Sequence, residues 1–86
     1  MNNPKTKSYI IFYKTAKNKP LRHTTKIETT KEKCKQYIRN KQYIPIKVFT
    51  EQELKELMSY GKNAYLVYIN LSVDLLDYIF KHLSNN

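Results

Sequence analysis

Residues 28–60, ETTKEKCKQYIRNKQYIPIKVFTEQELKELMSY, decide the fold predicted for this chain. Two threonines within this stretch, Thr29 and Thr50, are each followed three residues later by a glutamate. That spacing is typical of a capping box, in which a hydroxyl and a carboxylate satisfy free backbone N–H groups at a helix start. The pattern predicts one helix over residues 30–40 and a second that starts after Thr50.

The residues between these helices predict a strand. Residues 43–49, YIPIKVF, are rich in β-branched and aromatic side chains, which favour strands. Pro45 has no N–H to donate to a neighbouring strand, so the strand is predicted to lie at a sheet edge or to carry a bulge there. Gly61 is placed to end the second helix in the left-handed conformation.

A hairpin is predicted before this stretch. Residues 8–14 (SYIIFYK) carry apolar side chains on both faces, which is typical of a central strand. A turn follows over residues 15–20, in which Asn18 is able to adopt a positive φ. The return strand alternates, and this alternation predicts that Leu21, His23, Thr25 and Ile27 face inward while Arg22, Thr24, Lys26 and Glu28 face water.

The last third is more apolar. Residues 64–69 (AYLVYI) are predicted to form a buried strand, and Ser72 to cap a final helix; the alternative is one helix over residues 62–82. The whole chain is predicted to be α+β. A flexible basic arm, residues 1–7, precedes a single domain, residues 8–86. In that domain the hairpin is followed by α-β-α-(β)-α, giving a mixed sheet covered by two to three helices.

The charge balance is the most informative feature of the composition. Sixteen lysines and arginines oppose seven acids, and 14 of the 16 are lysine, a bias that an AT-rich coding sequence also produces. However, residues 1–47 hold 13 basic residues against two acids, a balance of +11, whereas residues 48–86 hold three against five, a balance of −2. A codon bias of the genome would raise the lysine content of both halves equally. The asymmetry predicts a surface that binds a polyanion.

The predicted binding residues lie on the hairpin, the second strand and the first helix. Because lysines dominate, they are expected to contact phosphates with weak sequence preference rather than to read bases. Tyr9 and Tyr13, on one face of the first strand, are candidates for base stacking, although tyrosines on a central strand are more often core residues. The predicted cations are Lys14, Lys17, Lys19, Arg22, Lys26, Lys31, Lys35 and Arg39.

Several classes of protein are not expected. A single glycine excludes glycine-rich phosphate loops. The only cysteine, Cys34, cannot form an internal disulfide, and no hydrophobic leader is evident, so a reducing, cytoplasmic setting is expected. The longest apolar block is far shorter than the roughly 20 residues of a membrane-spanning helix. Cys34, His23 and His82 lack metal-ligand spacing, so neither a metal nor another cofactor is expected.

Three functions remain open, in decreasing order of preference. The first is nucleic-acid binding, to DNA or RNA, mainly through phosphates. The second is an interaction protein of a phage or mobile element, which docks on an acidic or nucleic-acid-loaded protein complex of a host or defence system and inhibits or modulates it. The third is a small metal-independent ribonuclease toxin; the chain is otherwise expected not to be an enzyme. The ribonuclease would use Arg22, His23, Tyr37 and Arg39.

Overall fold

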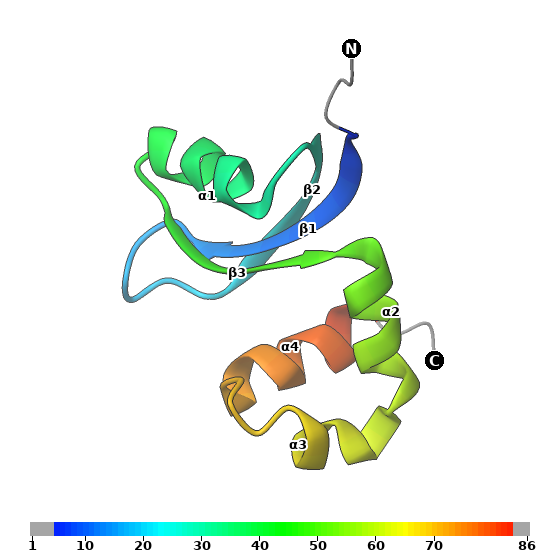
Figure 1. The fold of residues 1–86 in the computed structure, drawn as a ribbon. Helices are drawn as coiled ribbons and strands as arrows, with labels where there is room; N and C mark the ends of the chain where they lie inside the picture. The colour runs from blue at the N-terminus through cyan, green and yellow to red at the C-terminus, as the bar shows by residue number, and fades with distance from the viewer. Residues whose placement is uncertain (1–4, 84–86) are drawn as a thin grey trace. The chain divides into compact units, whose positions relative to one another are not determined.

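The computed structural model describes residues 5–83, which form one antiparallel sheet and four α-helices. The predicted α+β class is confirmed, but the predicted mixed sheet is wrong because every strand pair is antiparallel. The elements follow the order β1 (Lys7–Lys14), β2 (Arg22–Glu28), α1 (Lys31–Asn40), β3 (Ile44–Thr50), α2 (Glu51–Ser59), the short 3-10 helix η1 (Gly61–Asn63), α3 (Ala64–Val67) and α4 (Val73–His82) (Figure 1).

Contacts within the chain divide it into two compact units, Met1–Gln52 and Glu53–Asn86. We call the first the sheet unit, because it holds all three strands and α1, and the second the helical unit. The predicted N-terminal arm falls mostly outside the described residues, and its last residue, Lys7, begins β1. Buried side chains occur in both units.

The sheet has the strand order β2-β1-β3, so β1 is the central strand, as predicted. The pairing of β1 with β3 shifts register between Phe12, which faces Lys47, and Tyr13, which faces Pro45. Ile46 is therefore the extra residue of a bulge. The bulge and the edge position of β3 confirm the prediction from Pro45, whose missing N–H cannot join a regular ladder.

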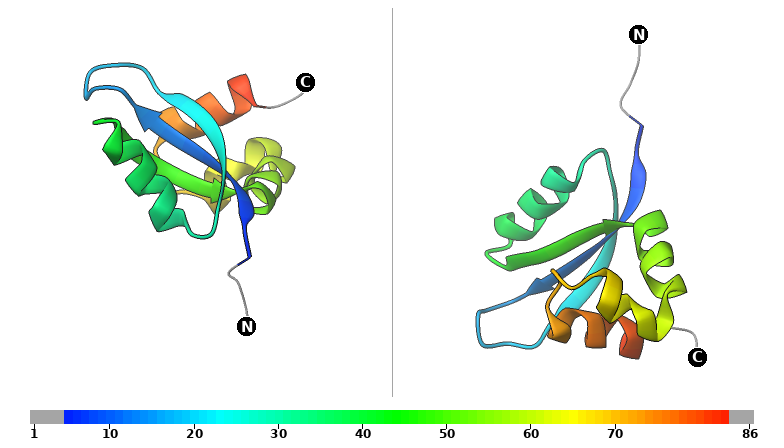
Figure 2. Two further views of the ribbon diagram at one scale, coloured as in Figure 1. Left: turned by 90° about the horizontal axis from the view of Figure 1, so that it is seen from above. Right: turned by 60° about the horizontal axis from the view of Figure 1, so that its bottom comes forward.

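One face of the sheet packs under α1 (Figures 1 and 2). Cys34 and Ile38, one helical turn apart, are fully buried against Tyr9, Ile11 and Val48. Burial of such side chains stabilises the fold by about 1.5–3 kcal/mol each. The other face carries Ile10, Phe12 and Phe49, and the two phenylalanine rings meet edge to face with centroids 5.8 Å apart.

The start of α1 differs from the predicted capping box by one residue. Thr30 is the N-cap, and its hydroxyl accepts a hydrogen bond from the Lys33 N–H (3.1 Å). The Thr29 N–H instead donates to its neighbour Glu28 (3.0 Å). Two adjacent threonines offer equivalent oxygens, so the spacing to Glu32 did not identify the cap. The second helix, α2, begins immediately after Thr50, as predicted.

In the helical unit, the predictions for Ser72 and Gly61 are confirmed and the predicted strand is wrong. Ser72 caps α4, because its hydroxyl accepts from the Leu75 N–H (3.1 Å), and Gly61 has the expected positive φ of 54°. The predicted strand over residues 64–69 is wrong, since Ala64–Val67 is the helix α3. Leu66 and Ile69 are 78% and 79% exposed, so this apolar run is not the buried strand that the sequence suggested.

The alternative of one helix over residues 62–82 is also wrong. Tyr68, with φ −111° and ψ 51°, ends α3. Ser72 is extended, with φ −67° and ψ 147°, and α4 begins at Val73. The capping preference of serine, which requires non-helical backbone, separates the two helices.

Candidate nucleic-acid interface

Positive charge is concentrated in the sheet unit. Residues 1–52 hold 13 lysines and arginines against three acids, a balance of +10. Residues 53–86 hold three lysines against four acids, a balance of −1. The division by contacts therefore coincides closely with the charge asymmetry of the sequence. If a polyanion binds, its electrostatic attraction comes from the sheet unit.

Three of the predicted cations lie at the connection between β1 and β2. Lys17 and Lys19 are exposed, and the connection is closed by a hydrogen bond from the Lys19 N–H to the Ala16 carbonyl (3.1 Å). Lys14, the last residue of β1, is half-buried. Asn18, although able to adopt a positive φ, does not have one in this connection.

Arg22 and Lys26 lie on the sheet face that α1 covers. Arg22 pairs with Tyr13 and Lys26 with Tyr9, and residues directly opposite in an antiparallel pair share a face. The predicted orientation of β2 is therefore wrong for Lys26, which is half-buried on this face, and for Ile27, which was expected inside and is 70% exposed. Arg22 is exposed, as predicted. Alternation separates the two faces of a strand but does not say which face another element will cover.

Tyr37, on α1, contacts two ammonium groups. Lys26 Nζ lies 4.4 Å and Lys41 Nζ 4.7 Å from the ring centroid, within the range of cation–π attraction. A hydrogen bond from Lys41, together with the charge of that ammonium, lowers the pKa of Tyr37, and Lys26 adds to this effect. The same hydrogen bond raises the pKa of Lys41.

A Schellman motif at the end of α1 positions Lys41 and Tyr43. The Gln42 N–H donates to the Arg39 carbonyl (2.8 Å), and the Tyr43 N–H donates to the Ile38 carbonyl (3.2 Å); these two hydrogen bonds define the motif. Gln42 has a φ of 64°, a conformation that favours glycine. The backbone around Lys41 and Tyr43 is thereby fixed.

Tyr43 stacks on Tyr13, with ring centroids 5.6 Å apart and planes 10° from parallel. These two rings and Tyr37 are partly buried against the core under α1. The ammonium of Lys41 is close enough to both Tyr43 and Tyr13 for their phenols to raise its pKa. The three rings and two ammonium groups form the tyrosine–lysine cluster, defined as Tyr13, Lys26, Tyr37, Lys41 and Tyr43.

Sequence reasoning missed part of this cluster. Lys41 and Tyr43 are absent from every predicted site, and Tyr37 was named only for the ribonuclease hypothesis. One signal was present: Tyr37 and Lys41 are four residues apart, which places them on one helix face. No comparable signal exists for Lys26, which reaches Tyr37 from the strand β2.

Tyr9 does not have the position expected of a stacking residue. Its ring is 4% exposed, in the core under α1, and its hydroxyl donates to the Thr29 carbonyl (3.3 Å). A base cannot reach the ring in this structure. Of the two predicted stacking residues, only Tyr13 belongs to the partly exposed aromatic group.

Lys31, Lys35 and Arg39 lie on a different flank of α1 from Tyr37. At roughly 100° per residue, Lys35 and Tyr37 point about 160° apart around the helix axis. The Tyr37 flank faces β2, because Lys26 contacts that ring. Arg39 also pairs with Glu32 (3.4 Å). The eight predicted cations thus form two groups, one on the hairpin and β2 and one on the far flank of α1.

The residues proposed for a ribonuclease do not converge. His23 pairs with Phe12, and their rings lie 6.2 Å apart on the sheet face opposite Tyr37. Cys34, which is not one of these residues, is buried, and burial raises the pKa of its thiol and disfavours the reactive thiolate. Among residues 5–83, no three His, Cys, Asp or Glu side chains are grouped to hold a metal ion. The geometry gives the ribonuclease hypothesis no support.

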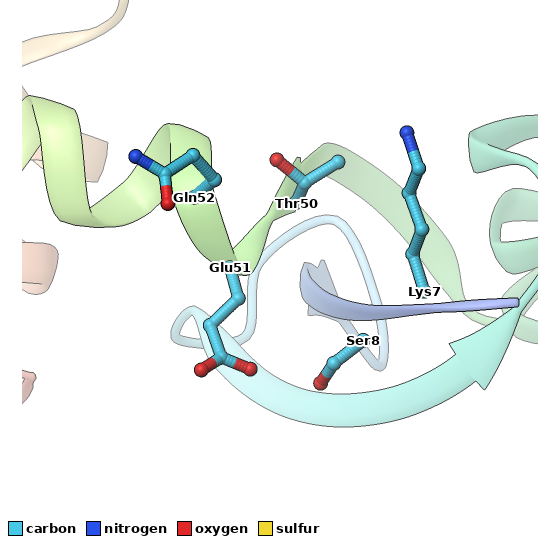
Figure 3. Close-up of a pocket in the computed structure, with 5 residues that line it drawn as sticks. All are labelled: Lys7, Ser8, Thr50, Glu51 and Gln52. Carbon is cyan, nitrogen blue, oxygen red and sulfur yellow. The ribbon is translucent and has the colours of Figure 1, made fainter.

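A pocket of about 350 Å³ lies beside the end of β3. It is lined by Lys7, Ser8, Thr50, Glu51 and Gln52. Figure 3 shows the Lys7 ammonium and the Glu51 carboxylate pointing to opposite sides. The polar groups therefore do not converge on one ligand atom, and the pocket adds nothing to the interface.

Between Lys62 and Lys81, the helical unit exposes apolar side chains and carries no basic ones. Residues 63–80 contain no lysine or arginine, and Leu66, Val67, Ile69 and Val73 are all exposed. Within the described part of the chain, no helix has the length and apolar character needed to cross a bilayer.

Comparisons with protein-family models, curated proteins and solved structures found no match for this chain. Function is therefore inferred from the charge distribution and from the contacts of the tyrosine–lysine cluster.

Proposed function

We propose that this protein binds nucleic acid through the sheet unit, mainly by phosphate contacts and with low sequence specificity. The observation that carries the proposal is the balance of +10 on residues 1–52 against −1 on residues 53–86. Eleven of the 13 basic residues in the sheet unit are lysines. Lysine is a flexible point charge that suits phosphate, whereas arginine is the usual reader of guanine.

The salt dependence of binding tests the proposal. Neutralising four or five phosphates should make log K fall with log salt at a slope of roughly −4 on duplex DNA. The measurement is fluorescence anisotropy or an electrophoretic shift with single- and double-stranded DNA and RNA across a salt series. Absence of binding at low salt, or binding that salt does not weaken, would contradict it.

A second function, docking on an acidic protein, is favoured by the open edges of the sheet. β2 and β3 are its outer strands, and on β3 Ile44 and Ile46 are 39% and 41% exposed. An extended acidic segment of a partner could pair with such an edge while its carboxylates face the lysines. A pull-down after nuclease treatment separates the two functions. Recovery of one stoichiometric protein favours docking, and loss of all partners favours nucleic acid.

A further inference from the structure

We propose that the tyrosine–lysine cluster makes the protein selective for single-stranded nucleic acid. This inference rests on the proposed nucleic-acid binding and specifies its substrate. The observation behind it is that three tyrosine rings, from β1, α1 and the segment before β3, lie together with two ammonium groups against one of the rings. Binding to phosphates alone would not require the aromatic rings.

The rings are the feature that distinguishes the two kinds of strand. In a duplex the base faces are stacked within the helix, so a protein that contacts phosphates gains nothing from an aromatic surface. A single strand can turn its bases onto tyrosine rings, and each stacked base contributes to affinity whatever its identity. Tyr13, Tyr37 and Tyr43 are only partly buried, so part of each ring surface faces solvent.

The ammonium groups are placed for the phosphates beside a stacked base. Lys26 comes from β2 and Lys41 from the end of α1, and both reach the ring of Tyr37. Lysine side chains are flexible, so either ammonium can move from the ring to a phosphate when a base takes its place. One ring with two cations provides the alternation of aromatic and positive groups that single-strand sites use.

The backbone under the cluster is already ordered. The hydrogen bonds of Gln42 and Tyr43 fix the end of α1, and Tyr43 is stacked on Tyr13. A preformed site loses less conformational entropy on binding than a disordered one. The cluster can therefore contribute to affinity without a folding step.

The experiment uses the full chain with oligothymidylate, oligouridylate and a mixed-sequence DNA duplex of equal length, at matched salt. We expect both single strands to bind at least about tenfold more tightly than the duplex, the effect of stacking one or two bases. Tyr37→Leu should weaken single-strand binding about tenfold and duplex binding much less. Tyr37→Phe, which keeps the ring, should retain the preference.

Tyr60→Leu is the matched control, because Tyr60 is in the helical unit, edge to face with Tyr68 at 5.8 Å. It should change neither affinity. If Tyr37→Leu fails to fold, the wild-type protein still tests the inference through its relative affinities for single strands and duplex. The chain has no tryptophan and eight tyrosines, so quenching of its intrinsic fluorescence by single strands, and not by duplex, reports stacking directly.

Equal affinity for single strands and duplex, or an equal loss on both with Tyr37→Leu, would overturn this inference and leave phosphate binding intact. No binding of any of the three probes at low salt would overturn the inference and the proposed function together.

Discussion

The sheet unit and the helical unit differ in what they present to solvent. The sheet unit carries a balance of +10, and its partly exposed tyrosines lie among lysines. The helical unit carries −1 and exposes aliphatic side chains such as Leu66 and Ile69. A lysine-rich codon bias acts on both units alike, so the difference shows that composition alone does not explain the charge. It is the reason we propose polyanion binding for the sheet unit.

Charge reversal near the cluster is expected to have the largest effect. The variant Arg22→Glu, Lys26→Glu, Lys41→Glu should weaken nucleic-acid binding by about a hundredfold or more at low salt. Each lost phosphate contact lowers the salt slope by about 0.9, so the slope should fall from roughly −4 to about −1. Fluorescence anisotropy across a salt series measures both quantities.

The matched control reverses the charge of three lysines of the helical unit, Lys55, Lys62 and Lys81, by substitution with glutamate. It changes the net charge by the same amount, so long-range attraction falls equally in both variants. The control should lose much less affinity and keep its salt slope. Equal losses in the two variants would mean that only net charge matters, and the comparison between units would fail.

The far flank of α1 is expected to contribute less. Lys31→Glu, Lys35→Glu, Arg39→Glu should weaken binding, but less than the cluster variant, because these residues lie away from Tyr37. Stability should change little, because the like-charge pairs among the three cations are exchanged for like-charge pairs among three glutamates, and each such pair costs a similar amount, about 0.2–0.5 kcal/mol. The Arg39–Glu32 pair that is lost is exposed and contributes little. A loss equal to that of the cluster variant would extend the interface over both flanks, and a large drop in thermal midpoint would make these side chains structural.

Local chemistry made part of the fold predictable from sequence. Pro45 implied an edge or a bulge because it lacks an N–H, Ser72 implied a helix start, and Gly61 implied a left-handed stop; all three are confirmed. Each of these effects depends on a residue and its immediate neighbours.

The predictions that failed concern features that depend on distant contacts or on a choice between nearly equivalent residues. Which face of β2 is covered depends on where α1 packs, so Lys26 was assigned to solvent although it contacts Tyr37. The left-handed residue of the Schellman motif is Gln42, where glycine or asparagine is the usual signal. The chemistry of the candidate site was predicted as phosphate contact, and its aromatic component was assigned to Tyr9, which is buried, and to Tyr13, which belongs to the cluster.

The two helix stops offer a smaller test, with one in each unit. Gln42→Gly should raise the free energy of unfolding by about 1 kcal/mol, because glycine adopts positive φ without the penalty of a side chain. Gly61→Ala should lower the free energy of unfolding by about 1 kcal/mol through the same conformational penalty. A steric clash would add nothing, because the new Cβ would meet no atom within 4 Å. Urea unfolding measures both. Destabilisation by Gln42→Gly would contradict the Schellman description of the α1 end.

The smallest expected effect is in the titration of the tyrosines. Tyr37 should ionise at lower pH than a free tyrosine, because Lys41 and then Lys26 lower its pKa. In the helical unit, the hydrogen bond to Asp77 raises the pKa of Tyr65, and burial raises that of Tyr68. Tyrosinate absorbance should therefore rise in an early and a late phase.

The sign of the stability change follows from these directions. A lowered folded-state pKa at Tyr37 favours the folded chain increasingly as pH rises through that pKa. The raised values at Tyr65 and Tyr68 favour it at lower pH, and that contribution is lost as pH rises through their folded-state pKa. Lys41→Met should abolish the early phase of absorbance and leave the late one. An unchanged early phase would mean that Lys41 does not contact Tyr37 in solution.

Amide chemical-shift mapping by NMR during titration with oligothymidylate tests the assignment of binding to the sheet unit most directly. We predict that the largest shifts occur at the tyrosine–lysine cluster and Arg22, with smaller ones at the hairpin connection and little change over residues 53–83. Shifts spread evenly over both units, or concentrated in the helical unit, would contradict the account.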